Sequence, residues 1–184
     1  MNLQLLLDDF STELKNRSGN LTEDSVRYYL FACMLRQDPQ LNNYMLELPY
    51  DLLISSKASN GLPVNIDKQT IPNGDQGKGF HNLELDMCYY NGNQCFSIEI
   101  KFHRHNNKSH AFPHTMSAGS LFNDLRRLEL IQPNPLIMEY DRLFLYVTDQ
   151  EMHNYLVNDL IAGLLFAWLY PAQKIFISRM CVEV

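Results

Sequence analysis

The stretch that decides the fold is Glu84 to Lys101, which reads ELDMCYYNGNQCFSIEIK. Two runs in which apolar and polar residues alternate lie on either side of Asn91-Gly92. This pair is the most favoured in two-residue hairpin loops, because both positions tolerate a positive φ angle. The sequence therefore predicts two antiparallel strands joined by a tight turn at Asn91-Gly92.

Side chains on such a hairpin alternate between two faces, and directly opposed residues share a face. A loop of two residues would place Asp86 opposite Ser97 and Glu84 opposite Glu99. One predicted face is apolar and consists of Leu83, Leu85, Met87, Tyr89, Phe96, Ile98, Ile100 and Phe102. The other face carries Glu84, Asp86, Cys88, Tyr90, Cys95, Ser97, Glu99 and Lys101. Like charges opposite each other destabilise a sheet unless a cation binds or a pKa shifts, so we interpret the second face as a candidate metal site.

Length and composition narrow the class of protein. A chain of 184 residues is expected to form a single domain over 1–184 with a core of its own. The net charge of −6 argues against a protein that coats nucleic acid by charge alone. There is no secretory signal pattern at the N-terminus, and the most apolar run, 160–170, is shorter than the roughly 20 residues that cross a membrane. The four cysteines lack zinc-finger spacing, and we interpret them as thiols of a reducing cytoplasm. Because the apolar runs are short, we expect no membrane association.

Hydrophobic periodicity and turn residues divide the rest of the chain. Helices are predicted over 2–16, 22–36, 117–131 and 151–169. Strands are predicted over 44–55, 142–148 and 174–184 in addition to the hairpin, and 57–82 and 103–114 are expected to be loops. The order α, α, β, β, β, α, β, α, β predicts an α/β protein with a mixed central sheet flanked by helices.

The charged positions of the hairpin have the spacing D-x12-E-x-K, formed by Asp86, Glu99 and Lys101. Two carboxylates from adjacent strands suit Mg²⁺ or Mn²⁺, which bind oxygen ligands and keep positions for water and a phosphate. Glu99 and Lys101 are two residues apart and share a face, so the lysine can orient or deprotonate an attacking water. These residue types in this pattern favour hydrolysis of a phosphodiester.

With these residues the segment resembles the PD-(D/E)XK phosphodiesterase superfamily, the restriction-endonuclease-like nucleases. The resemblance covers about 21–149 and implies an αβββαβ core, to which 2–16 adds a helix and 151–184 a helix and a strand. It implies that Asp86 and Glu99 bind the metal and that Lys101 is catalytic. It further implies metal ligation by Glu23 on the first core helix and by the backbone carbonyl of Ile100.

Three further positions bear on this resemblance. Leu85 stands where many members of the family have a proline, a position that varies among them. Glu84 is an additional acid that either helps to bind a second metal ion or points to solvent. Glu47, in the strand predicted next to the hairpin, is a candidate to contact the side chains that bind the metal.

Basic side chains near the hairpin are candidates for contact with substrate phosphates. They are His103, Arg104, Lys108, Arg126 and Arg127. The segment 103–114 also has histidine spacings that could bind zinc, or it could be a solvated loop. The two arginines could equally belong to a solvated helix face, paired with Asp124 or Glu129.

We therefore predict a metal-dependent nuclease whose partner is DNA and whose cofactor is Mg²⁺ or Mn²⁺. The alternatives are a protein of the same fold that binds nucleic acid or acts as a scaffold without cleaving, and a zinc enzyme centred on 103–114. Glu99 and Lys101 could also form an exposed ion pair in a structural sheet. A homodimer formed through the helix at 151–169 is a further candidate arrangement, with core burial of that helix as the alternative.

Overall fold

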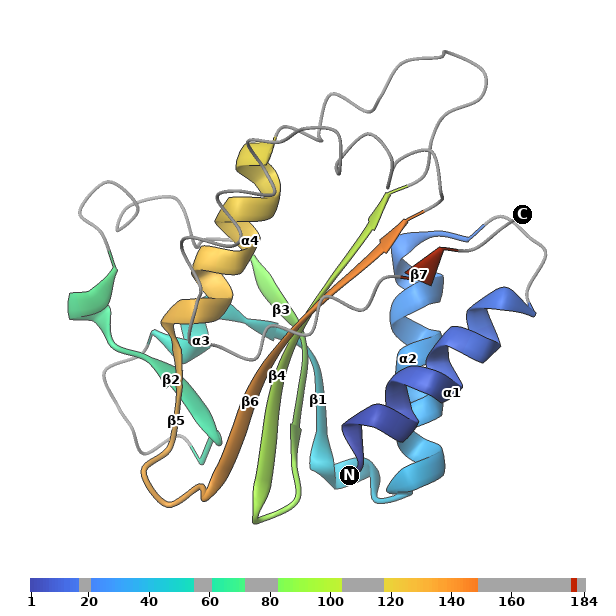
Figure 1. The fold of residues 1–184 in the computed structure, drawn as a ribbon. Coiled ribbons are helices and arrows are strands. Elements are labelled where there is room, and N and C mark those ends of the chain that lie inside the picture. The colour runs from blue at the N-terminus through green and yellow to red at the C-terminus, as the bar shows by residue number, and fades with distance from the viewer. Residues whose placement is uncertain (17–20, 55–60, 72–82, 104–117, 149–179, 182–184) are drawn as a thin grey trace. The chain divides into compact units, whose positions relative to one another are not determined.

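The computed structural model describes residues 1–16, 21–54, 61–71, 83–103, 118–148 and 180–181 (Figure 1). Its helices are α1 (Leu3–Lys15), α2 (Glu23–Gln37), α3 (Tyr50–Leu53) and α4 (Ala118–Leu130), with short 3₁₀ turns η1 (Leu41–Asn43) and η2 (Lys68–Thr70). Its strands are β1 (Tyr44–Pro49), β2 (Val64–Ile66), β3 (Glu84–Tyr90), β4 (Gln94–His103), β5 (Ile131–Pro133), β6 (Glu139–Thr148) and β7 (Met180–Cys181). None of the helices so described is both long enough and apolar enough to span a bilayer.

Five strands form a sheet in the order β1-β3-β4-β6-β7, and β2 pairs with β5 in a separate two-stranded sheet. The pairs β1–β3 and β3–β4 are antiparallel, whereas β6–β7 is parallel. The predicted α/β class with a mixed central sheet is therefore confirmed. The finer prediction, a restriction-endonuclease-like core, stays a prediction. The small β2–β5 sheet was not predicted, because each of its strands has only three residues.

The chain divides into two compact units. The first unit comprises Met1–Pro39, Ile100–Phe122 and Phe144–Val184, and the second comprises Gln40–Glu99 and Asn123–Leu143. The single domain expected from the length of the chain stays a prediction.

In the first unit, α1 and α2 pack against each other, as their apolar spacing predicts. Their buried residues are Leu6, Leu7, Phe10 and Leu14 on α1 and Val26, Leu30, Cys33 and Met34 on α2. Thr22 caps α2: its side chain accepts from the Ser25 N–H at 3.2 Å while Ser25 Oγ accepts from the Thr22 N–H at 2.8 Å. The Thr22 cap determines where α2 begins, and its apolar residues determine which face it buries.

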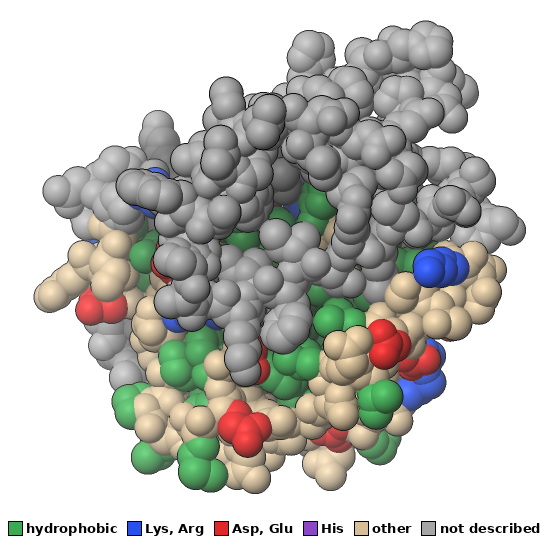
Figure 2. Space-filling model, in the orientation of Figure 1, with side chains coloured by type: hydrophobic (Ala, Val, Ile, Leu, Met, Phe, Trp, Pro, Cys, Tyr) green, Lys and Arg blue, Asp and Glu red, His purple; other side chains and the backbone are tan. Residues whose placement is uncertain are grey.

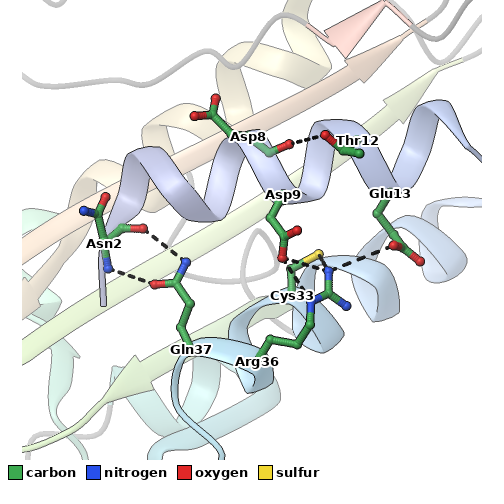
Figure 3. A network of polar contacts seen from close by, with 8 residues as sticks. All are labelled: Asn2, Asp8, Asp9, Thr12, Glu13, Cys33, Arg36 and Gln37. Carbon is green, nitrogen blue, oxygen red and sulfur yellow. Dashed lines mark hydrogen bonds and ion pairs between the residues drawn. The ribbon is translucent and has the colours of Figure 1, made fainter.

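The two helices are also joined by polar contacts (Figure 3). Arg36 of α2 donates from Nε and NH2 to Oδ2 of Asp9 on α1, at 3.0 and 2.8 Å. Gln37 and Asn2 exchange a second pair of hydrogen bonds near the start of α1. Arg36 also donates to the sulfur of Cys33 at 3.0 Å. Burial raises the pKa of that thiol. These polar contacts join α1 to α2 outside their apolar interface, and we call them the clamp.

In the second unit the predicted hairpin forms, but its turn lies one residue later than predicted. The Asn91 N–H donates to the Gln94 carbonyl at 3.2 Å, which leaves Gly92 and Asn93 as the two loop residues. Asn91 Oδ1 accepts from the N–H groups of Asn93 and Gln94, at 3.1 and 2.9 Å. Gly92 has a φ of 97°, a conformation that a side chain would strain. The side chain of Asn91 thus stabilises a turn that the dipeptide rule alone does not capture.

The later turn changes the register. Cys88 pairs with Ser97, so the predicted pairings of Asp86 with Ser97 and of Glu84 with Glu99 are wrong. The shift amounts to two residues along β4. Because side chains alternate with a period of two, a shift of two leaves every side chain on its predicted face.

The strand predicted over 44–55 is shorter than expected. It ends at Pro49, and the chain turns at once into α3. The Tyr50 N–H donates to the Leu83 carbonyl at 3.0 Å, which holds the start of α3 beside the start of β3. β1 lies at one edge of the five-stranded sheet, as a proline within a strand indicates. Within it Glu47 is exposed and has a φ of 52°, a left-handed conformation that is uncommon outside glycine.

Two predicted elements, the strand β6 and the helix α4, form close to their expected bounds. β6 contains the predicted apolar run, and Leu143–Val147 are all buried, as a central strand requires. α4 buries Leu125 and Leu128, each 3% exposed. The expectation that Asp124 points outward is wrong, since this residue is only 4% exposed. Arg104, Lys108, the helix at 151–169 and most of the strand at 174–184 lie outside the described residues.

Candidate functional site

The polar face of the hairpin is buried. Asp86 is 8% exposed, Glu99 is 7% exposed and Ser97 is fully buried. Asp86 and Glu99 lie one residue beyond the last pair of the ladder, Met87 with Ile98, each on its own strand. Alternation directs both carboxylates to the face that carries Ser97. Burying two carboxylates on neighbouring strands costs free energy unless opposite charge offsets it.

Tyr50, the first residue of α3, brings a hydroxyl among these carboxylates. Burial raises its pKa well above the usual value, the negative charges of Glu99, Asp124 and Asp86 raise it further, and Arg127 lowers it. A phenol with such a pKa stays protonated at neutral pH. The charges that act on the Tyr50 hydroxyl come from Arg127 and from three carboxylates that we call the acidic cluster (Asp86, Glu99 and Asp124).

The fourth charged member of this group comes from α4. Arg127 NH2 forms an ion pair with Asp124 Oδ1 one helical turn earlier, and the two side chains are 19% and 6% exposed. Arg127 was predicted either to face substrate or to pair with Asp124 on a solvated surface. The pair forms, but in a largely buried setting, where its Coulomb energy is screened less than at a surface.

The end of α4 is fastened to the strands beside the acidic cluster. Tyr140 OH of β6 lies 3.0 Å from Ser97 Oγ of β4 and 3.2 Å from the carbonyl of Ile131, the residue that follows α4. Arg142 donates to the same carbonyl from Nε and NH2, at 3.0 and 2.7 Å. Burial raises the pKa of Tyr140, so its hydroxyl remains a donor. This anchor places the C-terminal end of α4 over the face of β4 that carries Glu99.

In the first unit, Glu23 lies at the start of a helix, as the sequence predicts, and its metal ligation stays a prediction. It is the first residue of α2, and its Oε2 accepts a hydrogen bond of 3.2 Å from the Phe102 N–H in β4. Phe102 directly follows Lys101, which is half-buried. The carboxylate at the start of α2 thus accepts a hydrogen bond from β4, the strand that carries Lys101, the predicted catalytic lysine.

The other predicted residues occupy varied environments. Glu84, at the start of β3, and Arg126, on α4, are exposed, and the exposed Glu47 lies on β1. Ile100 is 1% exposed, and His103 is the last residue of β4. Sequence reasoning missed Tyr50 and the burial of Asp124. The three-residue spacing of Asp124 and Arg127 indicates that they can pair but not that they are buried, and no local pattern indicated Tyr50.

The acidic cluster can be compared with what a divalent cation requires. Within the described parts of the chain, no group of three or more histidine, cysteine, aspartate or glutamate side chains is arranged to hold a metal ion. Mg²⁺ does not need such a cage, because it commonly binds one or two carboxylates and completes its shell with waters and substrate phosphates. Asp86 and Glu99, buried on adjacent strands, fit this kind of donor set.

The face of the molecule drawn in Figure 2 gives no further guide to a ligand. On the face drawn in Figure 2, the lysines and arginines of the described residues lie at separate places rather than in one continuous patch. The chain matches no protein-family model, no curated protein and no solved structure. The interpretation of the candidate site therefore depends on the residues of this chain alone.

Proposed function

We propose that the protein is a divalent-metal-dependent phosphodiesterase that cleaves DNA. The observation that supports this most is the pair of buried carboxylates, Asp86 and Glu99, on neighbouring strands of one hairpin. Lys101 follows Glu99 by two residues in β4, so the two side chains leave the strand on the same face. The resemblance to the PD-(D/E)XK nucleases supplies the reaction type.

The chain's own residues divide the work as follows. Asp86 and Glu99 would hold Mg²⁺ or Mn²⁺, and the resemblance adds Glu23 and the carbonyl of Ile100 as further ligands. Such an ion, when bound, polarises a phosphate oxygen and makes water a stronger nucleophile. Lys101 orients the attacking water and offsets negative charge that develops on the phosphate. The phosphodiester is then hydrolysed in one step: the water oxygen bonds to phosphorus as the leaving oxygen departs.

Binding of the polymer needs basic groups that solvent can reach. Arg126 is exposed on α4, next to the buried pair, and is suited to contact a phosphate of the backbone. His103, at the end of β4, and Arg104 and Lys108 beyond it complete the proposed contacts. A contact of this kind adds affinity without sequence specificity.

The direct test is incubation of the purified chain with plasmid and single-stranded DNA in the presence of Mg²⁺ or Mn²⁺. We expect cleavage that chelation with EDTA abolishes. Glu99→Gln and Lys101→Ala should each lower the rate by about 10²-fold or more, the usual effect of losing a group that acts in the transition state.

Matched controls come from the same part of the chain. Glu84→Gln changes an exposed acid of the same hairpin, and Lys68→Ala changes an exposed lysine of η2. Both should cleave like the parent. Binding of DNA without cleavage would favour the non-cleaving protein of this fold, and activity that depends on zinc would favour the segment at 103–114. If Glu99→Gln and Lys101→Ala cleave as well as the parent, the assigned site is wrong.

A further inference from the structure

The last residues of β4 are held by a side chain of α2. The Phe102 N–H donates to Oε2 of Glu23 at 3.2 Å, and the contact is partly buried. Both residues belong to the first unit, so the contact lies within one compact part of the chain. The two residues are 79 positions apart in the sequence, so the fold and not a local pattern brings them together.

The ladder between β3 and β4 explains why this N–H needs an acceptor. In an antiparallel ladder, every second residue of a strand turns its N–H and C=O toward the same neighbouring strand. The hydrogen bond from the Asn91 N–H to the Gln94 carbonyl closes the hairpin, so the N–H of Phe102, an even number of residues beyond Gln94, faces the side of β3. Continued at the same register, the ladder would place Phe102 opposite Leu83. The Leu83 carbonyl accepts instead from the start of α3, and Glu23 supplies the acceptor for Phe102.

The side chain of Glu23 is not needed to cap its own helix. Thr22 and Ser25 form the capping box of α2, in which each side chain accepts from the N–H of the other residue. The helix also packs against α1 and is joined to it by the clamp. Glu23 therefore reaches β4 from a helix whose start and packing other residues determine.

The bonded N–H belongs to the peptide unit that joins Lys101 to Phe102. A peptide unit is planar, so a hydrogen bond that fixes its N–H also fixes its orientation and restricts the ψ angle of Lys101. The backbone of a strand residue in turn sets the direction of its Cα–Cβ bond. The contact with Glu23 therefore sets the direction in which the Lys101 side chain leaves β4, whatever contacts its ammonium group makes.

We propose that Glu23 is a positioning residue, which holds the peptide after Lys101 and so fixes the direction of that lysine for its part in cleavage. This inference rests on the proposed function, in which Lys101 orients the attacking water. Glu23 is here a hydrogen-bond acceptor for the backbone, whereas the resemblance makes it a ligand of the metal. The two roles differ in what they require, because an acceptor needs only an oxygen atom and a ligand of Mg²⁺ is typically a charged carboxylate.

The first test compares two substitutions of Glu23 in the full-length protein. Glu23→Gln keeps an oxygen at the same reach but makes the acceptor neutral, so kcat for plasmid cleavage should stay within about threefold of the parent. Glu23→Ala removes the acceptor and lets Lys101 move, so kcat should fall about 10²-fold with KM unchanged. Asp24→Ala removes an exposed acid at the next position and is the control, which should cleave like the parent.

Two measurements that do not depend on cleavage accompany these rates. Calorimetric titration with Mn²⁺ should give the same affinity for Glu23→Gln, Glu23→Ala and the parent, because Glu23 does not bind the ion in this role. Hydrogen exchange of the Phe102 amide, followed by NMR, should be slow in the parent and in Glu23→Gln. It should be faster in Glu23→Ala, which lacks the acceptor.

A double-mutant cycle separates positioning of Lys101 from a general loosening of the fold. In a Lys101→Ala background no lysine is left to misplace, so E23A/K101A should cleave at the rate of Lys101→Ala, within about threefold. A contact that only stabilised the fold would lower the rate by the same factor in both backgrounds. Such a result would overturn the inference.

The outcomes keep the two proposals apart. If Glu23→Gln binds Mn²⁺ as weakly as Glu99→Gln does, Glu23 is a metal ligand, so the inference is overturned and the proposed function stands. Glu23→Gln alone decides between the two roles if Glu23→Ala does not fold. A parent that does not cleave DNA with Mg²⁺ or Mn²⁺ overturns both the proposed function and the inference.

Discussion

Two arginine–aspartate pairs lie in different settings in this protein. Arg36 and Asp9 join two helices of the first unit, with side chains 48% and 45% exposed. Arg127 and Asp124 lie on one helix of the second unit, with side chains 19% and 6% exposed. The first pair sits among other polar contacts between α1 and α2 (Figure 3). The second lies among carboxylates and a buried tyrosine.

The difference shows that an ion pair's role depends on its surroundings more than on its residue types. Water and salt screen the exposed pair, so its net contribution to stability is small. The buried pair is desolvated, so removing one partner leaves an uncompensated charge and costs far more. The first pair is a clamp between helices. The second is part of the buried group of charged side chains around Tyr50.

The largest expected difference concerns catalysis. Asp86→Asn and Asp9→Asn make the same chemical change in the two regions. Asp86→Asn removes a proposed metal ligand and should lower the rate of Mg²⁺-dependent DNA cleavage by about 10³-fold. Asp9→Asn should leave that rate unchanged, and its stability should change by less than about 1 kcal/mol. Equal rates for the two variants in a plasmid-nicking assay would break the comparison.

The next effect is on stability. Arg127→Ala should lower the free energy of unfolding by about 3 kcal/mol, because a buried carboxylate loses its counter-charge. Arg36→Ala should lower it by less than about 1 kcal/mol beyond the loss of its aliphatic contacts. Urea denaturation followed by circular dichroism measures both changes. A larger loss of unfolding free energy for Arg36→Ala than for Arg127→Ala would contradict the difference that we draw between the exposed and the buried pair.

A smaller effect appears at alkaline pH. Tyr50 and Tyr140, both in the second unit, have pKa values raised by burial, so the folded state keeps protons that the unfolded state loses. Stability from these groups is fully present below a pH of about 10 and falls above it, by about 1.4 kcal/mol per pH unit for each tyrosine. Unfolding free energies measured on either side of that pH should fall less steeply for Tyr50→Phe. A slope unchanged in this variant would show that Tyr50 does not titrate as described.

The smallest effect is that of salt. Raising NaCl to about 1 M shortens the screening length to about 3 Å and should remove the contribution of the exposed pair, which is below about 1 kcal/mol. The coupling energy of Arg36 with Asp9, from a double-mutant cycle, should therefore fall toward zero. The coupling of Arg127 with Asp124 should persist. Equal salt sensitivity would mean that the second pair is more hydrated than its burial implies.

Much of this arrangement could be predicted from local pattern. Helical periodicity predicted α2 close to its observed bounds, and alternation in the hairpin gave the correct faces even though the turn was misplaced by one residue. That misplacement arose because the Asn91 side chain accepts two hydrogen bonds at the turn, a preference that the Asn-Gly pair does not express. Asp86 and Glu99 were predicted to share a face because only parity is needed for that conclusion.

The rest depends on contacts between segments that are distant in the chain. Tyr50 joins the acidic cluster only because β1 ends at Pro49 and α3 begins beside β3, which periodicity does not reveal. Asp124 follows a polar residue on an amphipathic helix and looks solvated in sequence. Its burial follows from the anchoring of Ile131 through Tyr140, a contact made by a later strand.

The most direct test of the account is a crystal structure of the protein grown with Mn²⁺, examined by anomalous scattering. The account predicts one anomalous peak per chain, within about 2.5 Å of carboxylate oxygens of Asp86 and Glu99. A fully occupied peak elsewhere, with none between Asp86 and Glu99, would contradict the central claim.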